Sequence, residues 1–563
     1  MLDVRGAVCC AALLICLLAA EPAGAQLRAP GNSGGLPTNL PGAPVNPNAL
    51  VRPSREDVPP AGRRLTAKRV GALADSVAKV RRARREYPRA TRDVFLKGID
   101  RWQVSYFADT KPGRPRKEIA QVLIDDRSGR VLEAWTDYQV PWSMARGYPG
   151  AFGRIVNAPW VWISLALAFV APFLRRPWQM LHLDLLVLSA FSASTAFFNA
   201  ARVDVSVPLV YPLLVYLLAR MLWIGLRRGA PARRPLALLV PVGWLAVAVI
   251  FLVGFRVALN VTNSNVIDVG YAGVIGADRI VDGDALYGKF PRDNAMGDTY
   301  GPVIYLAYVP FEQALKWSGR WDDLPAAHAA AITFDLLALA LCFLIGRRVR
   351  GPDLGVLLAY AWATYPFTLY AQMSNSNDAL VAVLVLAAIW AADSAPARGA
   401  FVALAGLTKF APLALAPLLA MHGRPRSRAR SIAAFAGGFT VAAVLAFAPL
   451  AGDLSLRDFW DHTIAFQAQR GSPFSIWGLY DPDVAWLSYV QRAVQVAAAL
   501  LALALAFVPR RRDVVGLAAL CAAILIALQL GVSHWFYLYI PWFFGLVMIA
   551  LLGRFAMPER ART

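Results

Sequence analysis

The sequence predicts an all-α polytopic membrane protein that carries a small α+β domain near its N-terminus. Of the 563 residues, 58% are hydrophobic. Apolar runs of about 18 to 24 residues recur along the chain, the length that a helix needs to cross a hydrocarbon core of about 30 Å. Short loops between these runs carry pairs of Arg, which is the pattern that orients membrane helices. This composition excludes an ordinary soluble globule.

The net charge of +21 resembles that of nucleic-acid-binding proteins, but its sources are different. Part of the Arg lies in short loops between apolar runs, where it sets orientation. Much of the remainder lies in one hydrophilic region near the N-terminus. We therefore expect membrane lipids as partners and no nucleic acid.

Residues 1–25 have the pattern of a secretory signal peptide. Arg5 precedes an apolar stretch, Ala7–Ala20, and the small residues Ala23–Ala25 offer a cleavage site. The alternative is an uncleaved anchor helix, and in either case the following segment is exported. None of the five Cys lies in that segment, so no disulfide is expected there. Residues 26–64 are rich in Pro, Gly and Asn and predict a flexible linker.

Residues 65–150 predict a small extracytoplasmic α+β domain. Helical spacing with a basic face spans 65–85, and apolar residues alternate near 102–106, 120–124 and 131–135. A turn at Asp126–Gly129 predicts a hairpin between the last two runs. The segment VLIDDRSGRVLEAWTDYQV (122–140) resembles PepSY-like domains of exported bacterial proteins, and we find no catalytic constellation in it. The basic helix either contacts anionic headgroups or is simply solvated.

The apolar runs predict about 11 full spans and one hairpin, or 11 to 13 transmembrane helices. Residues 151–234 are expected to form additional transmembrane helices. Residues 235–555 are expected to form the catalytic region, and residues 556–563 a cytoplasmic tail. The run 302–317 is expected to lie in the interface, and 397–421 to form two half-helices that turn near Lys409, which keeps the following Arg cluster inside. The expected spans are 155–174, 179–200, 207–226, 235–258, 326–346, 353–372, 377–393, 431–450, 485–508, 513–532 and 535–553.

This topology gathers polar residues in the external loops, beside the outer leaflet. The loops contain an Asp-rich stretch from Asp268 to Asp298, the segment SNSND (374–378), the segment 458–483 and the segment 533–537. A site at a water–lipid boundary suits a substrate whose tail stays in lipid while its polar head reaches water. We therefore expect a lipid-linked substrate.

The order of these features resembles the GT-C superfamily of membrane glycosyltransferases, and glycosyltransferase family 87 in particular, over residues 235–555. The matching segments are IDVGYAGVIGADRIVDGDALYG (267–288), DTYGPVIYLAYVP (298–310), QMSNSNDALVAVL (372–384), LAGLTKFAPLAL (404–415), RGSPFS (470–475) and HWFYLYIPW (534–542). The resemblance implies inverting transfer of a mannose- or arabinose-class sugar from a polyprenyl-phosphate donor to an extracytoplasmic glycan or glycolipid. The first three membrane helices and the exported domain fall outside it.

One carboxylate suffices as general base in such a reaction, because a phosphate leaving group needs little acid help. We expect Asp268 to be that base, since the family pattern places its acidic residue near the membrane surface. The alternatives are that Asp268 caps a helix, or that Asp278, Asp282 or Asp284 is the base.

The remaining candidates bind substrate. Lys409 and Arg470 are expected to stabilise charge on the lipid phosphate. The alternatives are that Lys409 extends to the interface as a snorkelling Lys, and that Arg470 is an ordinary loop charge. His534 orients the acceptor or the base, or belongs to an interfacial aromatic belt. Tyr300 lies in the Tyr-Gly-Pro run. Three more residues bind sugar or acceptor hydroxyls, or only cap and turn the chain: Asn375, Asn377 and Asp298.

Two other classes of protein stay open. A flippase or exporter of lipid-linked sugars should carry charges deep in several helices, whereas Asp335 is the deep charge that the sequence indicates; we expect it to be paired. A non-enzymatic anchor would not need such elaborate outer loops. No His/Cys cluster has zinc spacing, and the Asp-rich loop offers a divalent cation only weak ligands, so a divalent cation stays open as a cofactor beside the polyprenyl-phosphate sugar donor.

Overall fold

The computed structural model describes residues 50–108, 116–147, 155–175, 179–227, 235–423, 428–452, 454–480, 485–508 and 513–557. The predicted signal peptide (1–25) and most of the predicted linker lie outside the described residues, as do most of the predicted tail and several of the Arg pairs.

A five-stranded antiparallel sheet forms the N-terminal domain, in the order β1-β2-β3-β4-β5. The predicted hairpin is confirmed, because β4 and β5 pair in antiparallel register around the turn that begins at Asp126. The sheet begins earlier than predicted: Leu50–Val51 pairs with Leu96 and Lys97 in β2, although the linker was expected to run to residue 64. The strands are β1 (Leu50–Val51), β2 (Thr91–Lys97), β3 (Arg101–Ala108), β4 (Lys117–Asp125) and β5 (Val131–Thr136).

Two short helices, α2 (Ala67–Asp75) and α3 (Ala78–Glu86), replace the single helix expected over 65–85. Their small apolar residues pack on the buried alternate residues of β3 and β4, which include Trp102 and Tyr106. The Nε1 of Trp102 donates to the Asp126 carboxylate, 2.7 Å away, so this buried indole is satisfied. The domain thus has a hydrophobic core of its own, while its likeness to PepSY-like domains stays a prediction.

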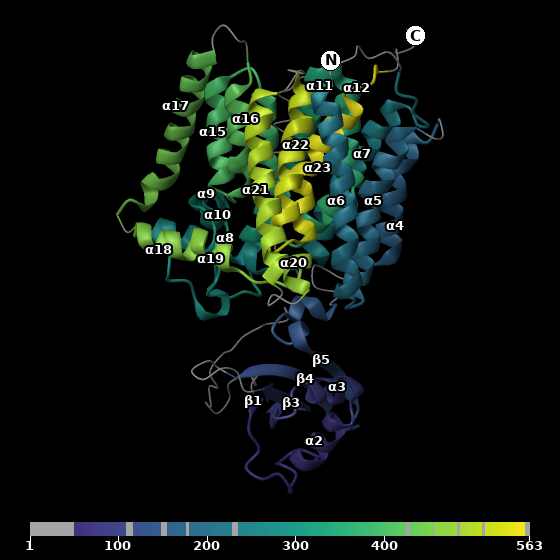
Figure 1. The fold of residues 1–563 in the computed structure, drawn as a ribbon, viewed down its shortest axis with the longest axis vertical. Coiled ribbons are helices and arrows are strands. Elements are labelled where there is room, and N and C mark those ends of the chain that lie inside the picture. Colours follow the sequence, from purple (N-terminus) through teal and green to yellow (C-terminus); the bar gives the residue numbers. More distant parts are fainter. Residues whose placement is uncertain are drawn as a thin grey trace. The chain divides into compact units, whose positions relative to one another are not determined.

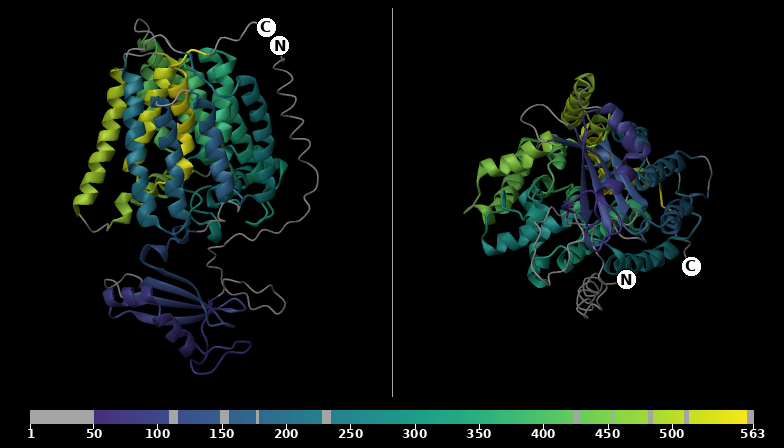
Figure 2. Two further views of the ribbon diagram at one scale, coloured as in Figure 1. Left: turned by 90° about the vertical axis from the view of Figure 1, so that its right-hand side faces the viewer. Right: turned by 90° about the horizontal axis from the view of Figure 1, so that it is seen from below.

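The remainder of the chain is helical, and seven of its described helices are long and apolar enough to cross a membrane. The prediction of a polytopic helical protein with an N-terminal sheet is therefore confirmed in outline, while the number of spans stays a prediction. Figure 1 shows these helices running side by side, and Figure 2 shows the same bundle from two further directions. The seven are α5 (Met180–Asn199), α6 (Val203–Leu226), α7 (Val242–Asn263), α11 (Pro325–Arg350), α17 (Arg428–Phe447, continued to Leu450), α21 (Ala485–Phe507) and α22 (Val514–Gly531).

Shorter helices are interrupted where Pro removes a backbone donor. The span expected at 353–372 is broken before Pro366, and the segment expected at 397–421 turns at Thr408–Lys409, so it is not one helix. The shorter elements are α4 (Pro159–Val170), α8 (Asp268–Asp282), α9 (Pro302–Leu306), α10 (Val309–Ala314), α12 (Pro352–Thr364), α13 (Pro366–Met373), α14 (Asp378–Trp390), α15 (Ala395–Gly406), α16 (Ala416–Met421), α18 (Leu456–Trp460), α19 (Phe466–Gln469), α20 (Ile476–Leu479) and α23 (Ile540–Leu552).

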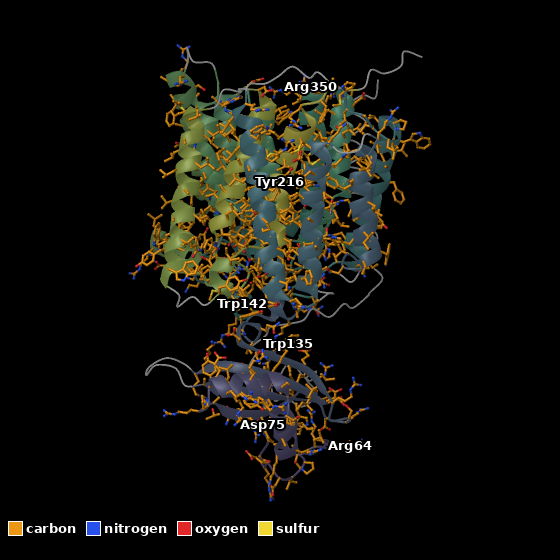
Figure 3. All side chains as sticks on the ribbon, turned by 45° about the vertical axis from the view of Figure 1, so that its right-hand side comes forward. Arg64, Asp75, Trp135, Trp142, Tyr216 and Arg350 are labelled. Carbon is orange, nitrogen blue, oxygen red and sulfur yellow. The ribbon has the colours of Figure 1, made fainter. Side chains whose placement is uncertain are left out.

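One end of the helical bundle gathers basic residues and the C-terminal segment. Arg175 donates to the backbone of Leu238, Leu236 donates to Ala556, and Arg350 donates to Gly553. Figure 3 shows Arg350 at this end of the bundle. The short helices α8, α9, α10, α18, α19 and α20 lie at the opposite end (Figure 1). Which end faces outward stays a prediction.

Buried ion pairs join helices within the bundle. Arg256 of α7 makes two hydrogen bonds to the Asp335 carboxylate of α11, at 2.6 and 3.0 Å, which confirms that Asp335 is paired. Arg220 of α6 forks onto Asp184 of α5 at 2.8 to 3.1 Å. The sequence indicated Asp335 as the deep charge, but Asp184, Arg220 and Arg256 are buried in the bundle as well. Each of these four charges has a partner.

Candidate active site

Asp268 is the first residue of α8, a helix that begins five residues after α7 ends. A carboxylate at this position interacts favourably with the positive end of the helix dipole. Solvent reaches the side chain, yet the surrounding protein removes enough water to raise the pKa of Asp268 above its ordinary value. The Asp268 carboxylate is thus both accessible to solvent and surrounded by protein, as expected of a side chain that lines a cleft.

Two cations oppose this shift. Arg470, in the loop after α19, exerts the largest lowering effect on the Asp268 pKa, and Lys409 adds to it, while Asp378 raises the pKa. Four charged side chains from four separate segments therefore act on one another at this cleft. Arg470 forms no ion pair with a carboxylate among the described residues, which leaves its guanidinium available to a ligand.

Lys409 and Asp378 form a buried ion pair beside Asp268. The Lys409 Nζ lies 2.5 Å from Asp378 Oδ1, and Trp542 Nε1 donates to the same oxygen at 3.0 Å. The ammonium also stands 5.3 to 5.5 Å from the ring centres of Tyr300, Tyr539 and Trp542. An ammonium has three donors, so the pair with Asp378 holds Lys409 in place and leaves donors for an anion.

His534 and Tyr300 complete the cleft. Burial, Arg470 and Lys409 lower the pKa of His534 well below its usual range, so the imidazole is neutral at neutral pH. Its Nδ1 lies 2.8 Å from the Ser472 hydroxyl. The other ring nitrogen, Nε2, is therefore left for a ligand. Burial and the neighbouring Asp268 raise the pKa of Tyr300, so its phenol stays protonated.

Asn375 and Asn377 are close to this cleft but engage the protein itself. Asn375 has a left-handed backbone (φ 50°), receives a hydrogen bond from Asn260 and donates to Ser264 and the backbone of Asn265. Asn377 donates to the carbonyl of Val269, next to Asp268. Both residues thus hold the turn before Asp378 against the start of α8, and their expected contact with sugar hydroxyls stays a prediction.

Asp298 lies apart from the charged group around Asp268. Its buried carboxylate accepts from the backbone N–H of Gly288 at 2.6 Å and lies 2.9 Å from His462 Nδ1. The other oxygen, Oδ1, has no partner within the described residues. The three alternative bases lie farther along the chain than Asp268: Asp278 and Asp282 lie in the later part of α8, and Asp284 follows the helix.

Sequence reasoning missed Asp378 as a member of the site. Its signal was present, because a Lys inside an apolar hairpin needs an acidic partner, and the carboxylate that opens the apolar helix α14 was the suitable candidate. Tyr539 and Trp542 were assigned only to an aromatic belt, whereas their rings flank the Lys409 ammonium.

An apolar groove of about 860 Å³ lies within the helical bundle. Its walls come from α9, α14, α15 and α17. Three of its lining residues lie within five residues of the charged group along the chain: Val303 follows Tyr300, Leu380 follows Asp378, and Leu404 precedes Lys409. Small residues of α15 and α17, among them Ala400 and Gly437, form the remaining wall, and their short side chains project little into the groove.

Metal binding is not indicated by a cluster of ligands: no group of three or more His, Cys, Asp or Glu residues gathers in the part of the chain that the structure describes.

Comparison with known proteins agrees with this geometry. No curated protein matches the chain. The model of glycosyltransferase family 87 matches residues 299–532, somewhat less than half of the chain. Tyr300, Asp378, Lys409 and Arg470 lie inside the matched region. His534 lies two residues after its end, whereas Asp268 lies 31 residues before its start. Over this region the chain is similar to glycosyltransferase family 87, which indicates a glycosyltransferase built into a multi-pass membrane protein.

Proposed function

We propose that this protein is an inverting glycosyltransferase that moves a sugar of the mannose or arabinose class from a polyprenyl-phosphate donor to a glycan or glycolipid. The observation that carries the proposal is the accessible carboxylate of Asp268, on which the charges of Arg470 and Lys409 act, together with the apolar groove between α9, α14, α15 and α17. A base, cations for a phosphate and a place for a lipid tail thus occupy one region.

In the proposed reaction, Asp268 takes the proton from an acceptor hydroxyl while that oxygen attacks the anomeric carbon. The new C–O bond forms on the face opposite the phosphate, and the bond between the anomeric carbon and the phosphate oxygen breaks. The polyprenyl phosphate leaves with the electron pair, and the proton stays on Asp268. Lys409 and Arg470 stabilise the charge that develops on the leaving phosphate, and the protonated phenol of Tyr300 is a further donor.

The apolar groove supports a lipid-linked donor. A prenyl chain gains free energy from apolar contact, and an apolar groove is a suitable place for it. Arg350 lies at the end of the bundle opposite α8 (Figures 1 and 3), which by the positive-inside rule supports an extracytoplasmic reaction at the cell membrane.

The direct test is sugar transfer in membranes that contain Asp268→Asn or the wild-type chain at equal protein level. Radiolabelled polyprenyl-phosphate mannose and arabinose are supplied as donors, and incorporation into glycan and glycolipid is measured. We expect Asp268→Asn to lose at least about a hundredfold in rate, the usual contribution of a general base. Asp282→Asn, at the exposed end of the same helix, is the matched control and should retain activity.

Other outcomes discriminate the alternatives. Loss of transfer only with Asp278→Asn, Asp282→Asn or Asp284→Asn would keep the reaction and move its base. Absence of transfer from both donors, with lipid-linked sugar accumulating on one leaflet, would replace the transferase by a flippase.

A further inference from the structure

The segment that follows β5 runs onto the helical bundle, and we name residues 137–147 the strap. It contains two short 3-10 turns, Asp137–Gln139 and Ser143–Arg146. Ala145 is fully buried in the same hydrophobic core as the membrane helices. The strap is therefore packed against the bundle and is more than a tether.

Polar contacts fix the strap's shape and its attachment. Gln139 donates to the backbone carbonyls of Ala145 and, across the interface, Ala201. Arg146 donates to the carbonyls of Gln139 and Val140. Gly147 has a left-handed backbone, and a Cβ there would stand 2.4 Å from the Ala201 nitrogen, so only Gly permits this approach.

This attachment brings Trp142 to the site residues. The Trp142 ring centre lies 6.1 Å from that of His534 and 5.5 Å from that of Phe474. Phe474 belongs to the run that begins with Arg470. Beyond His534, the rings of Tyr539 and Trp542 continue to Lys409. Trp142 is half-buried, so part of its surface remains open beside His534.

The donor and the strap approach the charged cleft through different elements. The apolar groove is lined by α9, α14, α15 and α17, whereas Trp142 contacts His534 and Phe474. With the donor tail in the groove, the side beside His534 and Trp142 is available to the second substrate. An indole combines an apolar face with a polar N–H, which suits the C–H face and the hydroxyls of a sugar ring.

We propose that Trp142 forms the acceptor side of the cleft and stacks against a sugar ring of the acceptor. The N-terminal domain thereby supplies a specificity residue to the reaction, through a segment outside the region that matches glycosyltransferase family 87. This inference rests on the proposed function, because it needs a transfer reaction with an acceptor.

The experiment measures transfer to two simple acceptors, octyl mannoside and octyl arabinofuranoside, with purified full-length Trp142→Ala, Trp142→Phe and wild type. Trp142→Ala should raise the acceptor KM about tenfold, the order that a well-placed aromatic contact contributes, and leave the donor KM unchanged. Trp142→Phe retains an aromatic face and should recover most of the loss.

Trp244→Ala is the matched control, because Trp244 is 68% exposed in α7. An acceptor KM that is unchanged in Trp142→Ala, or a loss equal in Trp244→Ala, would overturn the role of Trp142 while transfer by wild type stands. A raised donor KM, or a lower melting temperature that accompanies the loss, would assign Trp142 a structural role instead. Absence of transfer by wild type would overturn the proposed function itself.

Discussion

Asp268 experiences opposite influences on its pKa, and the balance decides when it can act as a base. Burial raises its pKa, and Arg470 gives the largest opposing effect. The carboxylate accepts a proton only when it is ionised, so activity should fall as pH drops through its pKa. Because this pKa is raised, the acid limb of the rate profile should lie above that of an ordinary carboxyl.

Arg470→Gln removes the strongest influence that lowers this pKa. The acid limb of kcat/KM should therefore move to higher pH, in addition to a weaker interaction with donor phosphate. The measurement is the pH profile of transfer for wild type and variant. Arg457→Gln, in the exposed α18, is the control and should leave the limb in place. A limb that stays where it is in Arg470→Gln would separate Arg470 from Asp268.

The Arg256–Asp335 pair allows a second test at the level of single residues. Arg256→Met leaves Asp335 as a buried carboxylate whose remaining donor, among the described residues, is the Trp362 Nε1. Removing one partner of such a pair costs about 3–5 kcal/mol, so the melting temperature in detergent should fall clearly. Arg256→Met combined with Asp335→Leu removes both charges and should regain most of that loss. A double variant as unstable as the single one would contradict the interpretation.

At the scale of elements, the site depends on the close approach of α8 to the turn between α13 and α14. Gly270, in the first turn of α8, has no room for a side chain: a Cβ there would stand 2.1 Å from the Asn375 carbonyl oxygen. The Asn375 and Asn377 side chains fix the same contact. The spacing of Asp268 from Asp378 and Lys409 therefore follows from this contact.

Gly270→Ala should push α8 away from the turn and lower the transfer rate at least about tenfold, since a small displacement of a catalytic group has a large effect on rate. Gly254→Ala is the control, because Gly254 lies within α7 with open space around it, and Ala is the better helix former by about 1 kcal/mol. Equal activity in the two variants would show that the contact does not set the geometry.

The sequence predicts elements well where a single physical signal dominates. Apolar length placed the long helices, and the bounds of α5, α21 and α22 agree with the expected ranges 179–200, 485–508 and 513–532 to within about two residues, the usual uncertainty of helix ends. The predicted span 235–258 was displaced, since α7 begins only at Val242 and continues to Asn263. Hydropathy does not encode the break at Pro366 or the pairing of Leu50–Val51, which depend on packing with distant segments.

The candidate site was predictable in part for the same reason. Charged residues at the outer ends of apolar runs are conspicuous, and Asp268, Lys409, Arg470 and His534 were all named from sequence. Their mutual placement, the pairing of Lys409 with Asp378 and the arrival of Trp142 all arise from contacts between residues far apart in the chain. Whether these residues carry the roles assigned to them stays a prediction.

At the scale of the whole molecule, we expect the apolar groove to set a preference for chain length in the proposed donor. Ala400→Trp fills the groove, and should raise the KM for a decaprenyl-phosphate sugar more than that for a farnesyl-phosphate sugar, because the longer chain loses more apolar contact at about 25 cal/mol per Å². The measurement is the ratio of kcat/KM for the two donors. Val247→Trp, on the exposed apolar side of α7, is the control. An unchanged ratio in Ala400→Trp would remove the groove from donor binding.

The buried ion pairs also have a consequence for synthesis of the protein. Arg256 and Asp335 are 79 residues apart in the chain, which corresponds to roughly 4–16 s of translation at about 5–20 residues per second. Until α11 emerges, α7 carries an uncompensated cation whose insertion costs about 2.5–3.5 kcal/mol. We therefore expect the nascent α7 to remain beside the insertion machinery, or near the interface, until α11 arrives, so that the spacing of these two charges delays its full insertion.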